Sequence, residues 1–241
     1  MSEEKTLTEF GFLVPTNYLR AVAMMASRDE TRLAICGVRV EIEGRNAMLV
    51  GTDGRRLMAV QWQPHPSSKE PLAPEPLAFT VPLSMIRMLK PARSLVHQTI
   101  VERYADGTVG LDLGGSSRAM MLRGKQPGEG KFPDWRRVPP LGELKPVHAA
   151  AFNPFMASEM VAAVMMLSGR RRRDPLAVQP WAEDGDAMKP IVWHFPSLEC
   201  SLDLLAIQMP IRFDERVRAA VVPRWARTAR AAQPCAAHAG L

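Results

Sequence analysis

The stretch FGFLVP at residues 10–15 runs from a short apolar strand into a proline, and an amphipathic segment follows at residues 18–26. The same order returns with LAFTVP at residues 77–82 and with AAAFNP at residues 149–154. The three prolines lie about 70 residues apart, which is a regular spacing for a chain of this length. A strand–proline–helix start that recurs at this period indicates a fold built by duplication of one unit.

Behind each start, apolar and polar residues alternate between turn signals, the pattern of half-buried antiparallel strands. Antiparallel hairpins with one helix per unit predict an α+β fold whose helices lie on one face of the sheets. The predicted helices span residues 18–26, 83–89 and 155–167, and the predicted strands after them span 35–43, 48–50, 57–62, 99–101, 109–113, 118–122, 176–181, 191–195 and 204–209.

The third helix has the clearest start. Asn153 can accept hydrogen bonds from the first free N–H groups, and Pro154 suits the first helical position because its missing N–H costs nothing there. Met156, Met160 and Val164 follow at helical spacing and predict the buried face.

Composition excludes several classes. The chain has 241 residues, 46% of them hydrophobic, and a net charge of +6, which permits a polyanionic partner without requiring one. It has no apolar run long enough to cross a bilayer, and its N-terminus is acidic and polar, so we expect a soluble, cytoplasmic protein. Cys36, Cys200 and Cys235 lack metal or disulfide spacing and are interpreted as reduced thiols.

Two conspicuous motifs come at the ends of the first two units. Residues 51–57, GTDGRRL, close a hairpin, and residues 130–140, GKFPDWRRVPP, follow the second unit. With residues 31–32, residues 37–44 and the final QMPIRF at 208–213, these segments resemble, in order, the bacterial sliding clamp, the β subunit of DNA polymerase III. That family typically reads TDGHRLA in the hairpin, FPDYRRVLP in the connector and MPMRL at its end.

The sequence departs from the family at a few positions. Arg55 stands where the family usually has His, and Trp135 where it has Tyr. Leu33 and Ala34 occupy positions where a family member can carry aromatic DNA contacts. One of the family's three domains and half of another have no counterpart here.

The resemblance implies a DNA-clamp fold, in which helices line a ring around duplex DNA and sheets form its outside. Its domains would be a clamp domain at residues 8–140, made of half-units 8–63 and 77–140, and a partial second domain at 141–213. Residues 1–7 and 214–241 would be tails, the second basic and disordered. The family's rings use twelve half-units, so chains with three each would need four copies.

The resemblance also implies a groove that binds peptide motifs of polymerases and repair proteins. Apolar walls would accept aliphatic or aromatic anchors, and basic groups would fix the orientation of the peptide. Matched position by position, its residues are Ile35, Thr52, Gly54, Arg55, Arg56, Leu57, Pro133, Arg137, Val138, Met209, Pro210, Ile211 and Arg212.

Cations on the helices would contact DNA phosphates without reading sequence, which gives salt-sensitive binding that permits sliding. For the arginine run at 170–173 the alternative is a solvated loop. The predicted DNA-contacting residues are Arg20, Arg28, Arg32, Arg87, Lys90, Arg93, Arg170, Arg171, Arg172 and Arg173.

We therefore predict a sliding clamp that tethers a polymerase, a homo-oligomeric ring without cofactor, metal or catalytic activity, with a clamp loader as a possible further partner. The sequence has no P-loop, GxSxG, HExxH or clustered metal ligands. One alternative is a clamp-derived module that binds clamp-motif proteins without enclosing DNA. A second is a basic accessory protein that binds DNA non-topologically.

Overall fold

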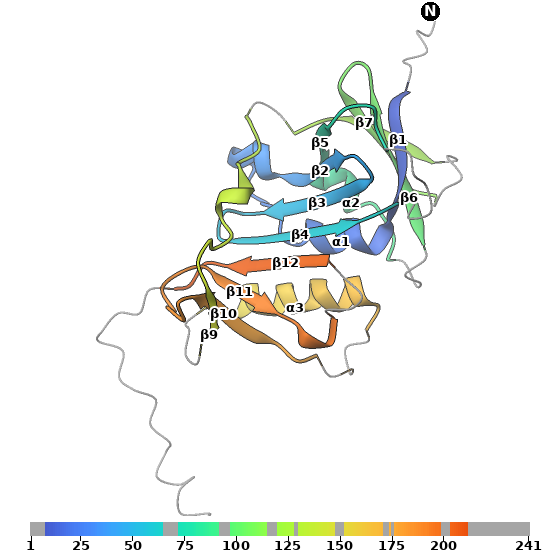
Figure 1. The fold of residues 1–241 in the computed structure, drawn as a ribbon. Helices are drawn as coiled ribbons and strands as arrows, with labels where there is room; N and C mark the ends of the chain where they lie inside the picture. Colours follow the sequence, from blue (N-terminus) through green and yellow to red (C-terminus); the bar gives the residue numbers. More distant parts are fainter. Residues whose placement is uncertain are drawn as a thin grey trace, which may run out of the picture. The chain divides into compact units, whose positions relative to one another are not determined.

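Strand exchange between the first two units organises the sheets (Figure 1). The computed structural model describes residues 8–64, 72–91, 97–114, 120–127, 130–147, 152–170, 174, 176–198 and 203–211. The first unit contains β1 (Thr8–Pro15), α1 (Thr16–Ala23), the 3-10 helix η1 (Glu30–Ile35), β2 (Gly37–Glu43), β3 (Asn46–Thr52) and β4 (Arg56–Trp62). The second contains β5 (Leu77–Pro82), α2 (Leu83–Ile86), β6 (Gln98–Tyr104), β7 (Thr108–Asp112) and β8 (Met121–Lys125).

The third unit begins after a connector that carries the 3-10 helix η2 (Trp135–Arg137). It contains β9 (Leu144–Pro146), α3 (Pro154–Ser168), β10 (Gln179–Glu183), β11 (Ile191–His194), η3 (Pro196–Leu198) and β12 (Asp203–Gln208). The described residues belong to one compact unit, which ends at Ile211.

The first strands of the first two units are exchanged between those units. β1 pairs with β6 in the sheet β1-β6-β7-β8, and β5 pairs with β2 of the first unit. In the third unit β9 pairs with β10, just as β1 pairs with β6 at the edge of the other sheet. This plan, one added strand beside three hairpin strands, occurs three times and confirms the predicted α+β clamp architecture.

A seam between β4 and β12 joins the first and third units into one eight-stranded sheet, β5-β2-β3-β4-β12-β11-β10-β9. The strands pair antiparallel from Asp203 opposite Gln61 to Gln208 opposite Arg56. The predicted partial domain is therefore continuous with the first unit through backbone hydrogen bonds.

Successive side chains along the strands at this seam point alternately into two hydrophobic cores. Met58 and Val60 of β4 face the helices and belong to the main core, which α1 and α3 share. Leu57 and Ala59 face the opposite side. There they pack in a second core with Ile207 of β12 and with residues of η1, β3 and the connector. Period-two alternation thus places a small apolar layer under the motif segments.

Capping groups fix α3 as predicted. The Asn153 Oδ1 accepts hydrogen bonds from the N–H groups of Phe155 (3.0 Å) and Met156 (3.4 Å), and Pro154 is the first helical residue. The helix ends at Gly169, whose φ of 67° is the left-handed conformation that favours glycine.

Several predicted boundaries were wrong. The α2 helix ends at Ile86, and turns follow to Leu89, shortly before Pro91, which disfavours a helical conformation at Lys90. The first helix ends at Ala23 rather than residue 26. Residues 30–35 form η1, so the next strand begins at Gly37, and β10 begins three residues later and ends two residues later than predicted. None of the described helices is both long and apolar enough to cross a membrane.

Candidate functional site

A groove of about 350 Å³ lies on the outer face of the seam between the first and third units. Its walls come from three parts of the chain: the β3–β4 hairpin, the connector around η2, and the end of β12. The lining residues are Thr52, Gly54, Arg55, Arg56, Leu57, Pro133, Trp135, Arg137, Val138, Pro190, Ile207 and Met209.

The hairpin wall is held by its own polar side chains. The Thr52 hydroxyl donates to the carbonyl of Arg56 (2.7 Å) and accepts from the N–H of Gly54 (3.0 Å). The Asp53 Oδ1 accepts from the N–H groups of Arg55 (2.8 Å) and Arg56 (3.0 Å). Gly54 has a φ of 85°, so glycine suits this turn. The TDG motif therefore fixes the loop shape through hydrogen bonds.

The connector wall is anchored by two aromatic side chains. Phe132 and Trp135 are buried in the second core, and the Trp135 indole N–H donates to Glu41 (3.4 Å). Arg39 stacks over the Phe132 ring at 5.9 Å, and burial lowers the pKa of its guanidinium. These contacts press the connector onto β2 and leave Pro133 and Val138 facing the groove.

The third wall follows β12. The Met209 N–H donates to the carbonyl of Arg55 (2.7 Å), so the end of β12 is tied directly to the hairpin. The Met209 side chain is 44% exposed at the groove. An extended ligand would therefore meet a mobile thioether beside two apolar side chains, Leu57 and Ile207.

The three arginines of the groove differ in availability. Arg55 is exposed, and the Arg137 side chain is 85% exposed beside Asp134, at 2.9 Å. The Arg56 side chain is only 6% exposed and is engaged by protein groups. Arg55 and Arg137 can thus meet a charged ligand, whereas the charge of Arg56 is already neutralised.

The structure brings together most of the thirteen predicted groove residues. Ile35 lies beneath the groove in the second core instead of lining it. Pro210 and Ile211 follow Met209 without lining the cavity, and Arg212 lies outside the described residues.

Three lining residues were not predicted from the sequence. Trp135 lies inside the connector motif at 130–140, and Ile207 directly precedes the terminal motif at 208–213 within the predicted strand 204–209, so their proximity to these motifs was the available signal. Pro190, in the turn before β11, carried no signal, because only the tertiary fold brings that turn to the seam.

A second feature lies on the helical side. Arg20, Arg28 and Arg87 of the α1 and α2 regions line one shallow pocket of about 200 Å³. Burial lowers the pKa of Arg20, yet an arginine remains protonated at neutral pH. Lys90 is exposed shortly after α2. Three of the predicted cations of the first two units, Arg20, Arg28 and Arg87, are therefore brought together in one pocket.

The other predicted DNA-contacting residues lie elsewhere. Arg32 donates to the carbonyl of Asp53 (2.7 Å) and so supports the groove hairpin. Arg170 is half-buried just after α3, which has Glu159 as its one charged residue. Arg93 and the run Arg171, Arg172 and Arg173 lie outside the described residues.

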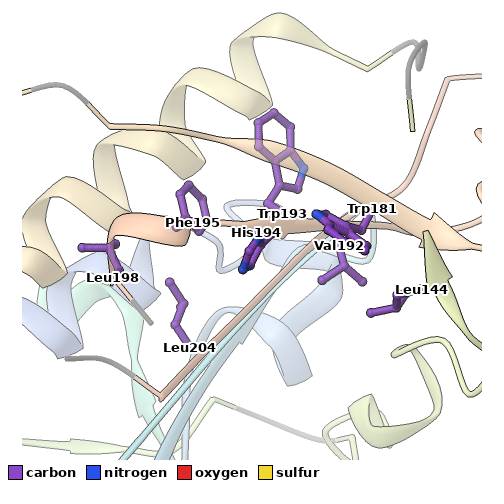
Figure 2. Close-up of a pocket in the computed structure, with 8 residues that line it drawn as sticks. All are labelled: Leu144, Trp181, Val192, Trp193, His194, Phe195, Leu198 and Leu204. Carbon is purple, nitrogen blue, oxygen red and sulfur yellow. The ribbon is translucent and has the colours of Figure 1, made fainter. Parts of the chain in front are cut away.

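A larger cavity of about 430 Å³ opens where β11 and β12 diverge, and we call it the aromatic cavity (Figure 2). These strands pair only at Ile191–Gln208 and Val192–Ile207 before they separate. The cavity is lined by Leu144, Trp181, Val192, Trp193, His194, Phe195, Leu198 and Leu204. Within the described ranges, no three His, Cys, Asp or Glu side chains cluster in a way that could hold a metal ion.

Comparison with solved structures identifies the fold of this chain. The chain superimposes on the DNA polymerase III beta subunit from Thermotoga maritima with a TM-score of 0.61 and 15% identity, covering 89% of this chain and 68% of that one. The beta subunit from Pseudomonas aeruginosa gives 0.59 and 15%, covering 88% and 69%. This protein has the sliding-clamp fold.

The DNA polymerase sliding clamp from Bacillus subtilis agrees, with a TM-score of 0.58, 14% identity and coverage of 88% and 68%. The predicted resemblance is thus confirmed at the level of the sliding-clamp fold. The sequence itself matches no family model and no curated protein. At these identities the likeness establishes the fold, while the use of the groove and the helix face rests on their own chemistry.

Proposed function

We propose that the protein is a DNA sliding clamp that encloses duplex DNA and tethers a polymerase through the seam groove. The observation that carries this proposal is the convergence of three motif segments, far apart in the sequence, around one groove within a sliding-clamp fold. Tethering raises the effective concentration of a polymerase at its template, so the function needs a binding groove and enclosure rather than an active site.

The groove suits an extended peptide with apolar anchors. Leu57, Val138 and Ile207 offer apolar surface, and Met209 can adapt to the shape of an inserted side chain. Arg55 and Arg137 stand exposed at its rim, where they can hold a peptide carboxylate or orient backbone carbonyls.

The helix face suits phosphates. Arg20 of α1, Arg28 in the segment after α1 and Arg87 directly after α2 line one pocket, on the elements that would face an enclosed duplex in the proposed ring. Contacts from arginines to phosphates are independent of base sequence and weaken with salt, which a sliding protein requires.

An open sheet edge supports assembly into a ring. Among the strands of the described residues, β8 ends its four-stranded sheet, whereas β4, its counterpart as the last strand of a unit, pairs along its outer edge with β12. An unpaired edge strand is a template for pairing with another chain. We therefore propose homo-oligomerisation through β8, and a loader that opens the ring remains part of this proposal.

The groove is tested by Met209→Ala combined with Pro210→Ala. Loss of the thioether wall and of the rigid turn should weaken binding of a fluorescein-labelled peptide with adjacent leucine and phenylalanine by at least tenfold, measured by anisotropy. The matched control, Met120→Ala with Pro74→Ala, changes an exposed methionine and an exposed proline outside the groove and should bind normally. Unchanged affinity in the first variant contradicts the groove assignment.

Enclosure is tested by retention on circular DNA. A clamp should remain on a closed circle and be lost when the circle is linearised, because it slides off the ends. A clamp-derived adaptor shows no dependence on ends, and a non-topological DNA-binding protein shows only steep salt dependence. A stable monomer in native mass spectrometry at micromolar concentration would also count against the ring.

A further inference from the structure

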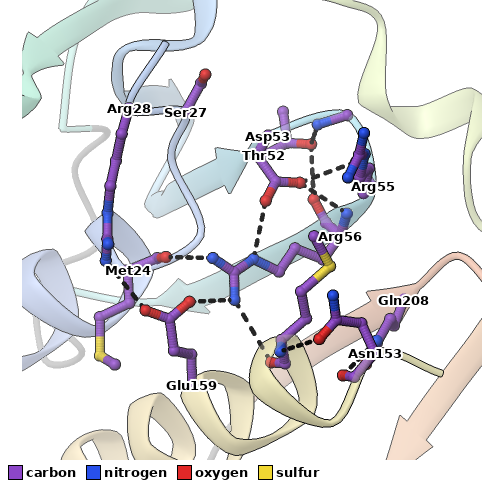
Figure 3. A network of polar contacts seen from close by, with 12 residues as sticks. Met24, Ser27, Arg28, Thr52, Asp53, Arg55, Arg56, Asn153, Glu159 and Gln208 are labelled. Carbon is purple, nitrogen blue, oxygen red and sulfur yellow. Dashed lines mark hydrogen bonds and ion pairs between the residues drawn. The ribbon is translucent and has the colours of Figure 1, made fainter.

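Arg56 is almost fully buried beneath the groove, and its guanidinium is surrounded by protein oxygen atoms (Figure 3). Its Nε pairs with the Asp53 Oδ2 at 3.0 Å, and its Nη1 pairs with the Glu159 Oε2 at 2.7 Å. Two backbone carbonyls accept hydrogen bonds from two of its other N–H groups, Met24 from Nη2 at 3.2 Å and Met156 from Nη1 at 3.4 Å. One side chain therefore gathers four partners.

Those partners come from separate elements. Asp53 belongs to the groove hairpin, Met24 follows the last turn of α1, and Met156 and Glu159 lie in the first turns of α3. The guanidinium thus fastens the hairpin of the first unit to the helix of the third. This contact lies on the helical side of the seam, opposite the groove, because Arg56 faces Gln208 in the β4–β12 register and Gln208 donates to the carbonyl of Asn153.

Glu159 has an unusual setting. It is the one charged residue of a largely apolar helix, and its side chain is 14% exposed. One carboxylate oxygen meets Arg56, and the other meets Arg28 at 3.0 Å. The Arg28 side chain is 60% exposed, so solvent screens this second arm far more than the first.

We propose that Glu159 is a positioning residue of the groove, although it does not line it. This inference rests on the proposed peptide-binding function. Arg56 lies between Arg55 and Leu57, which line the groove, and the Arg55 carbonyl holds the Met209 N–H of the opposite wall. Movement of Arg56 therefore shifts both walls, and Glu159 is the charged partner that holds Arg56 to α3.

Charge explains why the carboxylate matters. A buried guanidinium needs a charged partner, and removal of one member of a buried pair leaves the other uncompensated. With glutamine at position 159, the shape of the side chain is kept while Arg56 retains only Asp53 as a charged partner. The hairpin then loses its charged link to α3, so its own loop hydrogen bonds, including those from Asp53 to the Arg55 and Arg56 amides, should open more often.

The first test compares peptide affinity in the full chain. Glu159→Gln should weaken binding of the fluorescein-labelled leucine–phenylalanine peptide at least fivefold, while Arg28→Gln, which removes only the screened arm, should change it less than twofold. Asp106→Asn is the matched control, because it breaks an arginine pair at 2.6 Å in the other sheet, and it should bind like the wild type. Wild-type affinity in Glu159→Gln would overturn the inference.

A second test does not need a peptide. Amide hydrogen exchange at Arg55 and Arg56, whose N–H groups are held by Asp53, should accelerate at least fivefold in Glu159→Gln. The amide of Thr108, held in the same way by Asp106 at 2.9 Å, should keep its rate. If the wild type binds no peptide, the proposed function fails. If these rates do not change, the positioning role fails.

Should Glu159→Gln not fold, Glu159→Asp provides the same comparison with the charge retained. Its side chain is shorter by one methylene, so it should reach Arg56 less well and give an intermediate loss of affinity. Equal affinity for Glu159→Asp and the wild type, together with unchanged exchange at Arg55 and Arg56, would contradict the positioning role.

Discussion

The groove and the aromatic cavity both border β12, and they differ in origin. The aromatic cavity is the larger, about 430 Å³ against about 350 Å³, yet all of its lining residues belong to the third unit. The groove draws on the first unit, the connector and the third unit together. The proposed site is therefore not the larger of the two cavities. A seam between units can place apolar walls and exposed arginines side by side.

The largest expected effect tests whether the two cavities are independent. Trp193 is 8% exposed in the main core and meets the Phe152 ring edge-on at 5.1 Å. Trp193→Ala should lower the free energy of unfolding by about 3–5 kcal/mol, as measured by urea denaturation, because it enlarges the cavity. Leu141→Ala, at a side chain 98% exposed, should change it by less than about 0.5 kcal/mol.

Peptide affinity of the Trp193→Ala variant, measured well below its melting temperature, should equal that of the wild type. A parallel loss of affinity would show that the two cavities form one coupled region. If the tryptophan variant does not fold, Leu204→Ala tests the same wall with a smaller deletion.

A pair of glycines tests the hairpin. Gly54 and Gly107 both adopt positive φ, 85° and 78°, so alanine at either should cost about 1–2 kcal/mol of unfolding free energy. At Gly54 the new Cβ would also lie 2.6 Å from the Arg32 Nη2, whereas nothing lies within 4 Å at Gly107. Arg32 must then move away from Asp53, so Gly54→Ala alone should weaken peptide binding. Equal binding by both variants would place the hairpin outside the site.

The smallest effect concerns the rim charge. Arg137→Gln should weaken binding of a peptide with a free carboxylate about twofold to threefold and reduce its salt dependence, since exposed pairs contribute about 0.2–1 kcal/mol. The neighbouring Arg136 instead pairs with Glu41 at 2.8 Å and stacks on Trp135, so Arg136→Gln is the matched control. The prediction fails if the two variants have the same affinity across a salt titration.

Local signals predicted much of the fold. The Asn153–Pro154 start of α3 and the alternation in β2 were readable because capping and period-two burial depend on neighbouring residues. The end of α2 was misjudged, although Pro91 was visible, because apolar Leu89 continued the helical pattern. The exchange of β1 and β5 between units was not predictable from alternation, which gives the buried face but not the pairing partner.

The site was predictable where motifs carried it. Thr52, Gly54 and Leu57 were placed at the groove by the resemblance of their segment to the sliding clamp, and the structure gathers them there. The role of Arg56 was not visible in that segment. Its partner Glu159 lies in another unit, and a sequence does not state which charges meet across a seam.

The sequence by itself determined three repeated units, the start of α3 and the motif segments, because propensity, capping and periodicity act over a few residues. Only the tertiary structure decided that β12 pairs with β4, that Arg56 is buried against α3, and that Pro190 reaches the groove. Edge pairing and charge burial depend on which surfaces meet when distant segments pack. A local sequence pattern does not specify these long-range partners.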